Sequence, residues 1–152
     1  MNEKKDDIIK VENFSKSIKR IILDMSLEAG ASSSHFGGAL SISDIVAVLF
    51  GHTLKLNVNK ENILQKYDRF ILSKGHACLA YYAALHIIGK ISKEDLKTFE
   101  KDNSVLLGHP VKNPEIGIDF SNGSLGMGLS IGIGLAISNK KKKLNNRIYI
   151  IL

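Results

Sequence analysis

The segment Asp68-Arg-Phe-Ile-Leu-Ser-Lys-Gly-His-Ala77 decides the fold of this chain. Its short apolar run, Phe70-Ile-Leu72, has the length and character of a buried β-strand, and the polar turn Ser73-Lys-Gly-His76 ends that strand. A helical pattern follows from Ala77 to Ile88, with Gly89 in place to stop it. A strand that passes through a glycine turn into a helix indicates an α/β domain.

Similar patterns predict the elements on either side of this segment. Apolar residues recur at helical spacing from Asp7 to Ala29, and Gly30 ends that helix. The other predicted elements, in chain order, are a loop over 31–38, a helix over 45–50 that is capped by Ser41 with Asp44 and ended by Gly51, a small capped helix over 92–100, a long loop over 103–122, a helix over 125–141 and a strand over 147–152.

The last predicted strand bears on how complete the domain is. Arg147-Ile-Tyr-Ile-Ile-Leu152 is apolar after its first residue, as is typical of a parallel strand buried on both faces. Ligands of open α/β sheets bind to loops that follow the strands, yet no residue follows Leu152. Two strands alone also make a marginal sheet. We therefore expect residues 1–152 to form one partial α/β domain with parallel strands and flanking helices.

Composition narrows the class of protein. A length of 152 residues with 44% hydrophobic residues fits one packed domain. The single cysteine, Cys78, excludes a disulfide framework, and without a base partner in the sequence we interpret it as buried and inert. The charged N-terminus is no secretory signal, and the longest apolar uncharged stretch, Leu125 to Asn139, is too short to span a membrane. We expect a cytoplasmic protein.

The formal net charge of +6 comes from one place. Lys140 to Lys143 and Arg147 carry five positive charges with no acid among them, whereas the rest of the chain carries 16 positive and 15 negative charges. A basic surface along the whole chain is therefore absent, and nucleic acid is not predicted as a partner. We interpret the cluster as the solvated end of a helix, where cations complement the helix dipole.

Three of the five histidines are candidates for a binding site because each lies beside glycine. They are His35 before Gly37-Gly38, His76 after Gly75 and His109 after Gly108. Glycine lets the backbone approach a ligand closely, histidine donates to oxyanions, and a helix start such as that at His76 favours phosphate. Taken singly, each of them could instead be a turn or capping residue. A zinc site made of the three is not predicted, because their spacing resembles no metal motif.

A second candidate is the turn Gly123-Ser-Leu-Gly-Met-Gly128. A glycine-rich turn that leads into a helix is a general cradle for a diphosphate. Ile131 stands where the dinucleotide pattern needs its third glycine, so that fingerprint is incomplete. Gly128, Gly132 and Gly134 indicate close packing of the following helix against a neighbouring element.

Taken together, these segments resemble the N-terminal, thiamine-diphosphate-binding region of transketolase, and most closely the small subunit of its split, two-chain forms. The matching strings, in the order of the family, are Ser34-His-Phe-Gly-Gly-Ala-Leu-Ser41, Asp68-Arg-Phe-Ile-Leu-Ser-Lys-Gly-His-Ala77, Gly108-His-Pro110 and Ser121-Asn-Gly-Ser-Leu-Gly-Met-Gly-Leu-Ser130. The resemblance covers roughly Ile18 to Leu152. Phe36 and Ser34 stand where many members have proline and glycine, and both differences leave His35 in place.

The resemblance implies a role for each candidate. His35 and His109 match catalytic histidines that face the thiazolium and the reacting carbons of the substrate, and His76 matches the histidine near the diphosphate. Gly123, Ser124 and Leu125 match the turn that contacts the diphosphate and the aminopyrimidine. The family moves a two-carbon ketol unit from a ketose phosphate to an aldose phosphate, using the ylid of thiamine diphosphate.

The resemblance also implies what this chain lacks. In the family a Gly-Asp-Gly turn follows the strand that matches Arg147 to Leu152, and its Asp, with a later Asn, holds the Mg²⁺ that bridges to the diphosphate. No acid of this chain matches that role, so no metal ligand is predicted here. The glutamate that activates the aminopyrimidine also belongs to the absent part. We therefore expect the isolated chain to be inactive and to need a complementary transketolase segment or C-terminal subunit, as a homo- or hetero-oligomer.

Three alternative functions remain open at this stage. One is a piece of another thiamine-diphosphate enzyme such as 1-deoxyxylulose-5-phosphate synthase, although the Ser-Lys-Gly-His76 and Gly-His-Pro110 strings favour transketolase. Another is a non-catalytic module that docks through its incomplete sheet edge. The third is a small basic protein that binds nucleic acid through Lys140 to Lys143.

Overall fold

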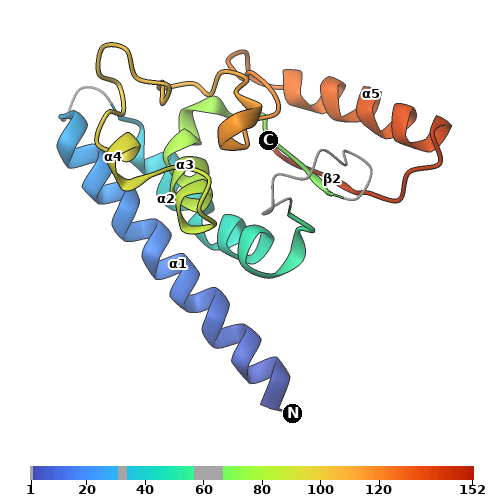
Figure 1. Ribbon diagram of the computed structural model, residues 1–152, viewed down its shortest axis with the longest axis horizontal. Helices are drawn as coiled ribbons and strands as arrows, with labels where there is room; N and C mark the ends of the chain where they lie inside the picture. The colour runs from blue at the N-terminus through green and yellow to red at the C-terminus, as the bar shows by residue number, and fades with distance from the viewer. Residues whose placement is uncertain (1, 31–33, 57–66) are drawn as a thin grey trace.

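The computed structural model describes residues 2–30, 34–56 and 67–152. Figure 1 shows the arrangement of its helices and strands. In chain order they are α1 (Asn2–Ala29), α2 (Phe36–Val48), the π-helical segment η1 (Leu49–Thr53), β1 (Arg69–Leu72), the 3₁₀ turn η2 (Gly75–Ala77), α3 (Cys78–Ile87), α4 (Lys93–Leu96), the 3₁₀ turn η3 (Pro114–Ile116), α5 (Met127–Lys141) and β2 (Ile148–Ile151).

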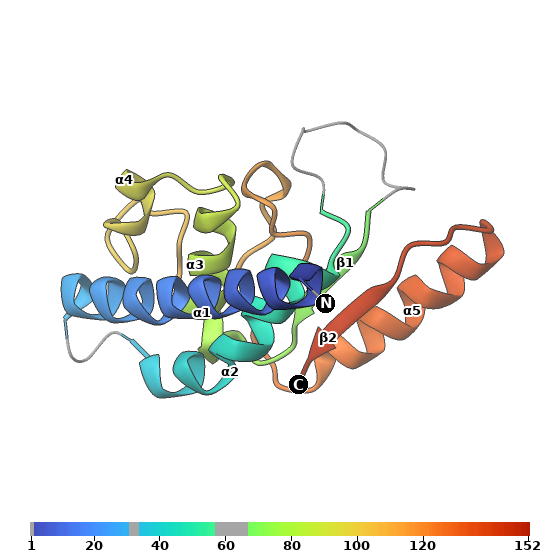
Figure 2. The ribbon, with the colours of Figure 1, turned by 90° about the horizontal axis from the view of Figure 1, so that it is seen from below.

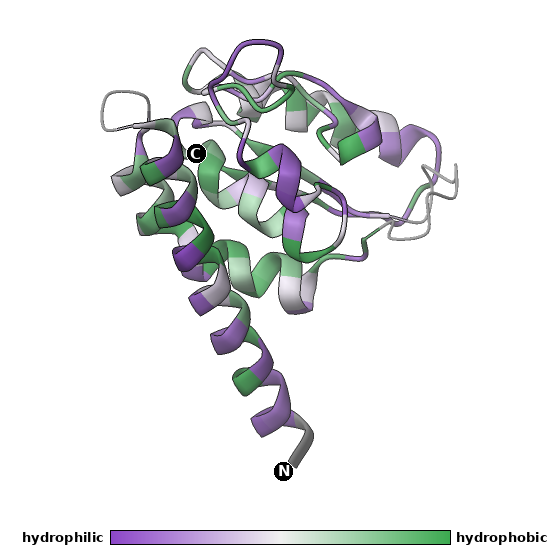
Figure 3. Ribbon diagram, turned by 60° about the vertical axis from the view of Figure 1, so that its left-hand side comes forward, coloured by the Kyte–Doolittle hydropathy of each residue, from purple (hydrophilic) through white to green (hydrophobic). Residues whose placement is uncertain are grey.

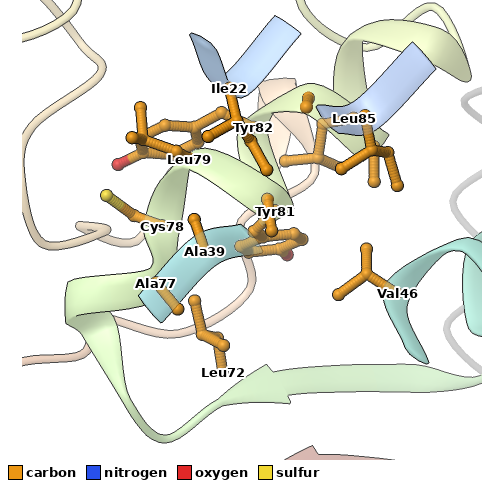
Figure 4. Packing of buried hydrophobic residues seen from close by; sticks show 14 of the residues in the cluster. Ile22, Ala39, Val46, Leu72, Ala77, Cys78, Leu79, Tyr81, Tyr82 and Leu85 are labelled. Carbon is orange, nitrogen blue, oxygen red and sulfur yellow. The ribbon is translucent and has the colours of Figure 1, made fainter. Parts of the chain in front are cut away.

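Helices α1, α2 and α3 pack together around the main hydrophobic core (Figure 2). Helix α1 contributes Ile18, Ile22 and Met25, whose spacing places them on one face of the helix. Helix α3 is the central element, because its residues from Cys78 to Leu85 are all buried. Figure 4 shows their side chains between those of α1, α2 and β1. The N-terminal part of α1 extends beyond this core and carries mainly hydrophilic residues (Figure 3).

The two strands form a parallel pair in which Phe70 of β1 is opposite Tyr149 of β2. The pleat separates their side chains into two layers. Phe70 and Tyr149 face the helical core, whereas Ile71 and Ile150 face α5. Helices therefore cover both faces of the sheet, and the predicted incomplete α/β fold with parallel strands is confirmed.

Strand β2 is less buried than its sequence predicts. All four of its residues are half-buried, so the expectation of a strand buried on both faces is wrong at this level of burial. The physical reason is that β2 has β1 as its only strand partner among the described residues, so its other edge is open.

Glycines of α5 allow the helix to lie close to the sheet. A Cβ on Gly128 would lie 2.6 Å from the Cβ of Ser73, and a Cβ on Gly132 would overlap the side chain of Ile150. Close packing at these two positions is as predicted. The prediction is wrong for Gly134, because nothing lies within 4 Å of the position of its Cβ.

The predicted boundaries of the second helix are wrong at both ends. The helix begins at Phe36, so Gly37 and Gly38 form its first turn instead of a loop, and Ser41 donates to the carbonyl of Gly38 instead of capping. At the other end Gly51 does not stop the helix but lies inside η1, where a Cβ would lie 3.3 Å from Cδ2 of Phe14. Tertiary packing overrides the helix-stop signal here.

By length and composition alone, Phe36–Thr53 could cross a membrane, since its mean hydropathy is 1.3 over 18 residues. The sequence patterns above did not single out this stretch. It includes a charged residue, Asp44, which accepts hydrogen bonds from Lys19 and Ser15 of α1. Its apolar residues Ala39 and Val46 are fully buried in the core, and core helices of this kind pass the same test.

The remaining boundaries agree with prediction to within a few residues. Gly30 and Gly89 follow α1 and α3 with φ of +85° and +78°, as helix-stopping glycines do. Ser92 caps α4 through a reciprocal pair with Asp95, although the helix ends at Leu96 and the chain continues in turns. The basic run at Lys140 ends α5 and is exposed, as predicted.

Candidate functional site

His35, His76 and His109 lie side by side although three separate elements carry them. His35 is the N-cap residue of α2, His76 lies in η2, and His109 lies in the loop between α4 and η3. The ring centroids of His35 and His76 are 4.9 Å apart, and those of His76 and His109 are 4.6 Å apart. Both pairs meet edge to face, so His76 is the central ring of the cluster.

The three imidazoles are available to a ligand. His35 and His76 are exposed and His109 is half-buried. Among the described residues, none of the three rings makes a hydrogen bond with the protein, so their ring nitrogens are free to donate or accept. We refer to these three side chains as the histidine cluster.

Gly75 makes the close approach within the histidine cluster possible. A Cβ at this position would lie 2.8 Å from Cδ2 of His109 and 3.6 Å from the carbonyl carbon of Asn122. A side chain there would displace one of these neighbours. The glycine before His76 therefore brings the β1–α3 junction, the His109 loop and the Asn122 segment together at one point.

The Gly123–Leu125 turn lies next to this point. The N–H of Asn122 donates to the carbonyl of Pro110 at 2.8 Å, which ties the start of the turn to the loop that carries His109. Beyond the turn, the N–H of Gly128 donates to the buried hydroxyl of Ser73 at 3.1 Å. The three residues of the turn are themselves exposed. The structure thus places Gly123, Ser124 and Leu125 beside the element that carries His76.

The backbone donors near this turn differ from those that the sequence pattern suggests. Helix α5 begins at Met127, after Gly126 with φ of +83°, instead of at Leu125. The N–H of Met127 donates to the carbonyl of Ser124, so the start of the helix is already engaged. Within the described residues the N–H groups of Gly123, Ser124 and Leu125 have no partner. The free donors therefore belong to the turn before the helix.

Ser73 supports the site, and sequence reasoning missed it. Its side chain is 2% exposed, its N–H donates to the carbonyl of Ile151, and its hydroxyl accepts from Gly128. It therefore joins β1, β2 and α5 directly before the turn that carries His76. The available signal was a small polar residue at the carboxyl end of a buried strand, where α/β folds place their sites.

Cys78 follows His76 by two residues and is confirmed as buried. Burial first, and the nearby Glu100 carboxylate second, raise the pKa of the Cys78 thiol from 9.0 to about 12. The thiol therefore stays protonated at neutral pH, and its S–H donates to the carbonyl of Gly108. An unreactive thiol is expected of such a position.

The donor set of this site fits an anionic ligand. Imidazoles and free backbone N–H groups are the groups that proteins use to bind phosphate oxygens. A Mg²⁺ ion needs hard oxygen ligands, usually carboxylates. In the part of the chain that the structure describes, no group of three His, Cys, Asp or Glu side chains could hold a metal ion. The site fits the diphosphate of a cofactor and does not by itself fit the cation.

Comparison with known proteins is consistent with this geometry. The family model described as transketolase, thiamine diphosphate binding domain, matches residues 12–148. One of the two subunits named for apulose-4-phosphate transketolase in Actinobacillus succinogenes is 36% identical over 141 residues, which are 93% of this chain and 50% of that protein. The transketolase of Physarum polycephalum is 37% identical over 119 residues, which are 78% of this chain and 18% of that protein.

Solved structures show the same similarity. Transketolase from Leishmania mexicana superposes with a TM-score of 0.82 at 28% identity, covering 92% of this chain and 22% of that chain. Transketolase from Campylobacter jejuni gives a TM-score of 0.81 at 30% identity, covering 92% and 23%. The chain therefore spans about half the length of the apulose-4-phosphate transketolase relative and about a fifth of the Physarum transketolase.

Proposed function

Because the chain belongs to the transketolase family, in its thiamine-diphosphate-binding domain, we propose that it contributes the histidine side of an active site for ketol transfer between sugar phosphates. The observation that carries this proposal is the convergence of the histidine cluster with the Gly123–Leu125 turn. Four segments that are distant in the sequence meet there, and each supplies a donor suited to phosphate or hydroxyl oxygens.

We assign the binding of the diphosphate to His76 and to the free N–H groups of Gly123, Ser124 and Leu125. His76 is the central ring of the cluster, and the turn lies beside it, so the two can act on neighbouring phosphate oxygens. When bound, thiamine diphosphate supplies the nucleophilic carbon and the electron sink of ketol transfer. The protein orients the cofactor and the substrate.

We assign the substrate side to His35 and His109, which flank His76 on either side. Their ring nitrogens are free, so each can donate to a sugar hydroxyl or exchange a proton with it. In a ketol transfer, hydroxyl protons must leave and return as the carbon–carbon bond breaks and forms. A histidine on each side of the cofactor-binding ring is suited to that task.

We further propose that the cation ligands and the cofactor-activating carboxylate come from a complementary transketolase segment or chain. The described residues offer no metal-binding group, and the relatives include single subunits of apulose-4-phosphate transketolases. On this proposal the 152-residue polypeptide binds thiamine diphosphate weakly and does not turn over sugar phosphates alone.

Isothermal titration with thiamine diphosphate, with and without Mg²⁺, tests this proposal. We expect no micromolar binding by the 152-residue polypeptide alone and Mg²⁺-dependent binding once a C-terminal transketolase subunit is added. His76→Ala should weaken the second signal by about 100-fold, as loss of a charge-assisted contact to phosphate does. His52→Ala, which removes a histidine outside the cluster, is the matched control and should leave it unchanged. Micromolar binding or turnover by the polypeptide alone would contradict the proposal.

A further inference from the structure

Two buried side chains of α3 donate hydrogen bonds to the segment directly before His109. Cys78 and Tyr82 stand four residues apart and therefore lie on the same face of the helix (Figure 4). The thiol of Cys78 donates to the carbonyl of Gly108 with an Sγ–O distance of 3.2 Å. The hydroxyl of Tyr82 donates to the carbonyl of Leu107 at 2.7 Å.

Glu100 holds the same segment from its other side. Its carboxylate accepts a hydrogen bond from the N–H of Gly108, and its own N–H donates to the carbonyl of Leu106 at 3.1 Å. Glu100 adopts φ of +58°, the left-handed region that non-glycine residues rarely occupy. A backbone held in this conformation indicates that the surrounding contacts determine it.

These contacts together fix both peptide groups that flank Gly108. The Leu107–Gly108 peptide is held at its oxygen by Tyr82 and at its nitrogen by Glu100, and the Gly108–His109 peptide is held at its oxygen by Cys78. Fixed peptide planes on both sides leave little freedom in the direction in which the next residue projects. Gly108 also leaves room for Glu100, since a Cβ there would lie 2.5 Å from Oε1.

The helix that holds this segment is the one that His76 precedes. η2 carries His76 and continues directly into α3 at Cys78, so one turn of chain carries a ring of the histidine cluster and the donor that fixes its neighbour. We propose that Cys78, Tyr82 and Glu100 are positioning residues that hold the His109 imidazole against His76. The consequence for catalysis rests on the proposed function, because His109 acts on the substrate only if that function is correct.

Tyr81 provides a matched control on the same helix. It is also buried, and its hydroxyl donates to the carbonyl of Gly117 at 2.8 Å, in the same long loop but beyond His109. Tyr81→Phe and Tyr82→Phe each remove one buried hydroxyl and one hydrogen bond to that loop. A purely structural role predicts the same effect for both variants, whereas a positioning role predicts that only Tyr82→Phe alters the histidine cluster.

The test is the nuclear Overhauser effect between the ring protons of His76 and His109 in the free 152-residue chain. We expect Tyr82→Phe and Cys78→Ala to weaken it by about two-fold, which corresponds to a ring displacement of about 0.5 Å, the tolerance of a functional constellation. Cys78→Ser, which keeps a donor at this position, should restore the signal, and Tyr81→Phe should leave it as in the native chain.

An unchanged signal in both Tyr82→Phe and Cys78→Ala, or an equal loss in Tyr81→Phe, would overturn the inference. If Tyr82→Phe does not fold, the comparison of Cys78→Ala with Cys78→Ser decides the question. The measurement needs no cofactor, so it is independent of the proposed function. If the ring signal behaves as expected while the complemented protein fails to bind thiamine diphosphate, the positioning role stands and the proposed function fails.

Discussion

The rings of His76 and His109 meet edge to face, with an interplanar angle of 79°. The contact exists because Gly75 has no side chain, since a Cβ there would lie 2.8 Å from Cδ2 of His109. The geometry of the histidine cluster is therefore sensitive to single atoms at positions that carry no functional group of their own, and this sensitivity can be tested.

Gly75→Ala should impair the site more than the fold. The added methyl group moves the His109 ring, and a misplacement of about 1 Å at a reacting group costs about 100-fold in rate. We expect that loss in the ketol-transfer activity of the protein complemented with a C-terminal subunit. Gly134→Ala is the control, because its methyl group meets nothing within 4 Å. Equal activity of both variants would argue against the contact.

Gly132→Ala and Gly134→Ala should change stability in opposite directions. A methyl group on Gly132 overlaps the side chain of Ile150, so α5 must shift away from the sheet. We expect the free energy of unfolding to fall by about 1–3 kcal/mol, as for an overpacked core. Gly134 faces open space within the same helix, so alanine there should stabilise by about 0.5–1 kcal/mol. Urea denaturation measures both changes.

Asp44 should contribute an acid-sensitive increment of stability. The hydrogen bond from Lys19 first, and that from Ser15 second, lower the pKa of Asp44 below 3.8. The contribution is therefore complete above pH 3.8 and is lost as the pH falls through the lower pKa of the folded state. Because the side chain is exposed, we expect at most about 1 kcal/mol.

Unfolding of the native chain and of Asp44→Asn, measured between neutral and acidic pH, checks this contribution. The difference in free energy of unfolding between the two proteins should be constant at neutral pH. It should shrink only when Asp44 itself becomes protonated. A difference that grows as the pH falls would have the wrong sign for this pair.

Cys78 should resist thiol reagents in the folded protein. Its pKa is raised from 9.0 to about 12, so at pH 8 its thiolate population is about 1,000-fold lower than that of an ordinary cysteine. Its side chain is also only 2% exposed. We expect very slow reaction with a chromogenic disulfide and rapid reaction in urea. As this chain has one cysteine, the absorbance reports this site alone. Rapid labelling without denaturant would show that the thiol is accessible.

Much of the fold could be predicted because local and tertiary preferences agree. The strand at Phe70, the helix after it and the glycine that stops that helix follow the usual rules, and the structure keeps them. The rules fail at Gly51, where a turn signal is overridden by packing against Phe14. They also fail at Phe36, because the loop-like composition of the preceding serines and following glycines hides the true start of the helix.

The candidate site could be predicted in its members but not in its construction. Glycine beside histidine singled out His35, His76 and His109, and the structure brings them together. Ser73, Glu100 and Tyr82 were missed, because their roles depend on contacts between distant segments that no local pattern reveals. Whether the three histidines carry the roles assigned to them stays a prediction.

The hydrogen bonds from α3 to the loop that carries His109 also bear on the order of folding. Helices α1, α2 and α3 can associate early, because most of their contacts are between segments near each other along the chain. The loop must then close over a finished α3 before Cys78 and Tyr82 can engage it. We expect the amides of α3 to gain protection in pulsed hydrogen exchange before that of Gly108 does. A folding molecule would then own a packed interior for some time before it owned a binding site.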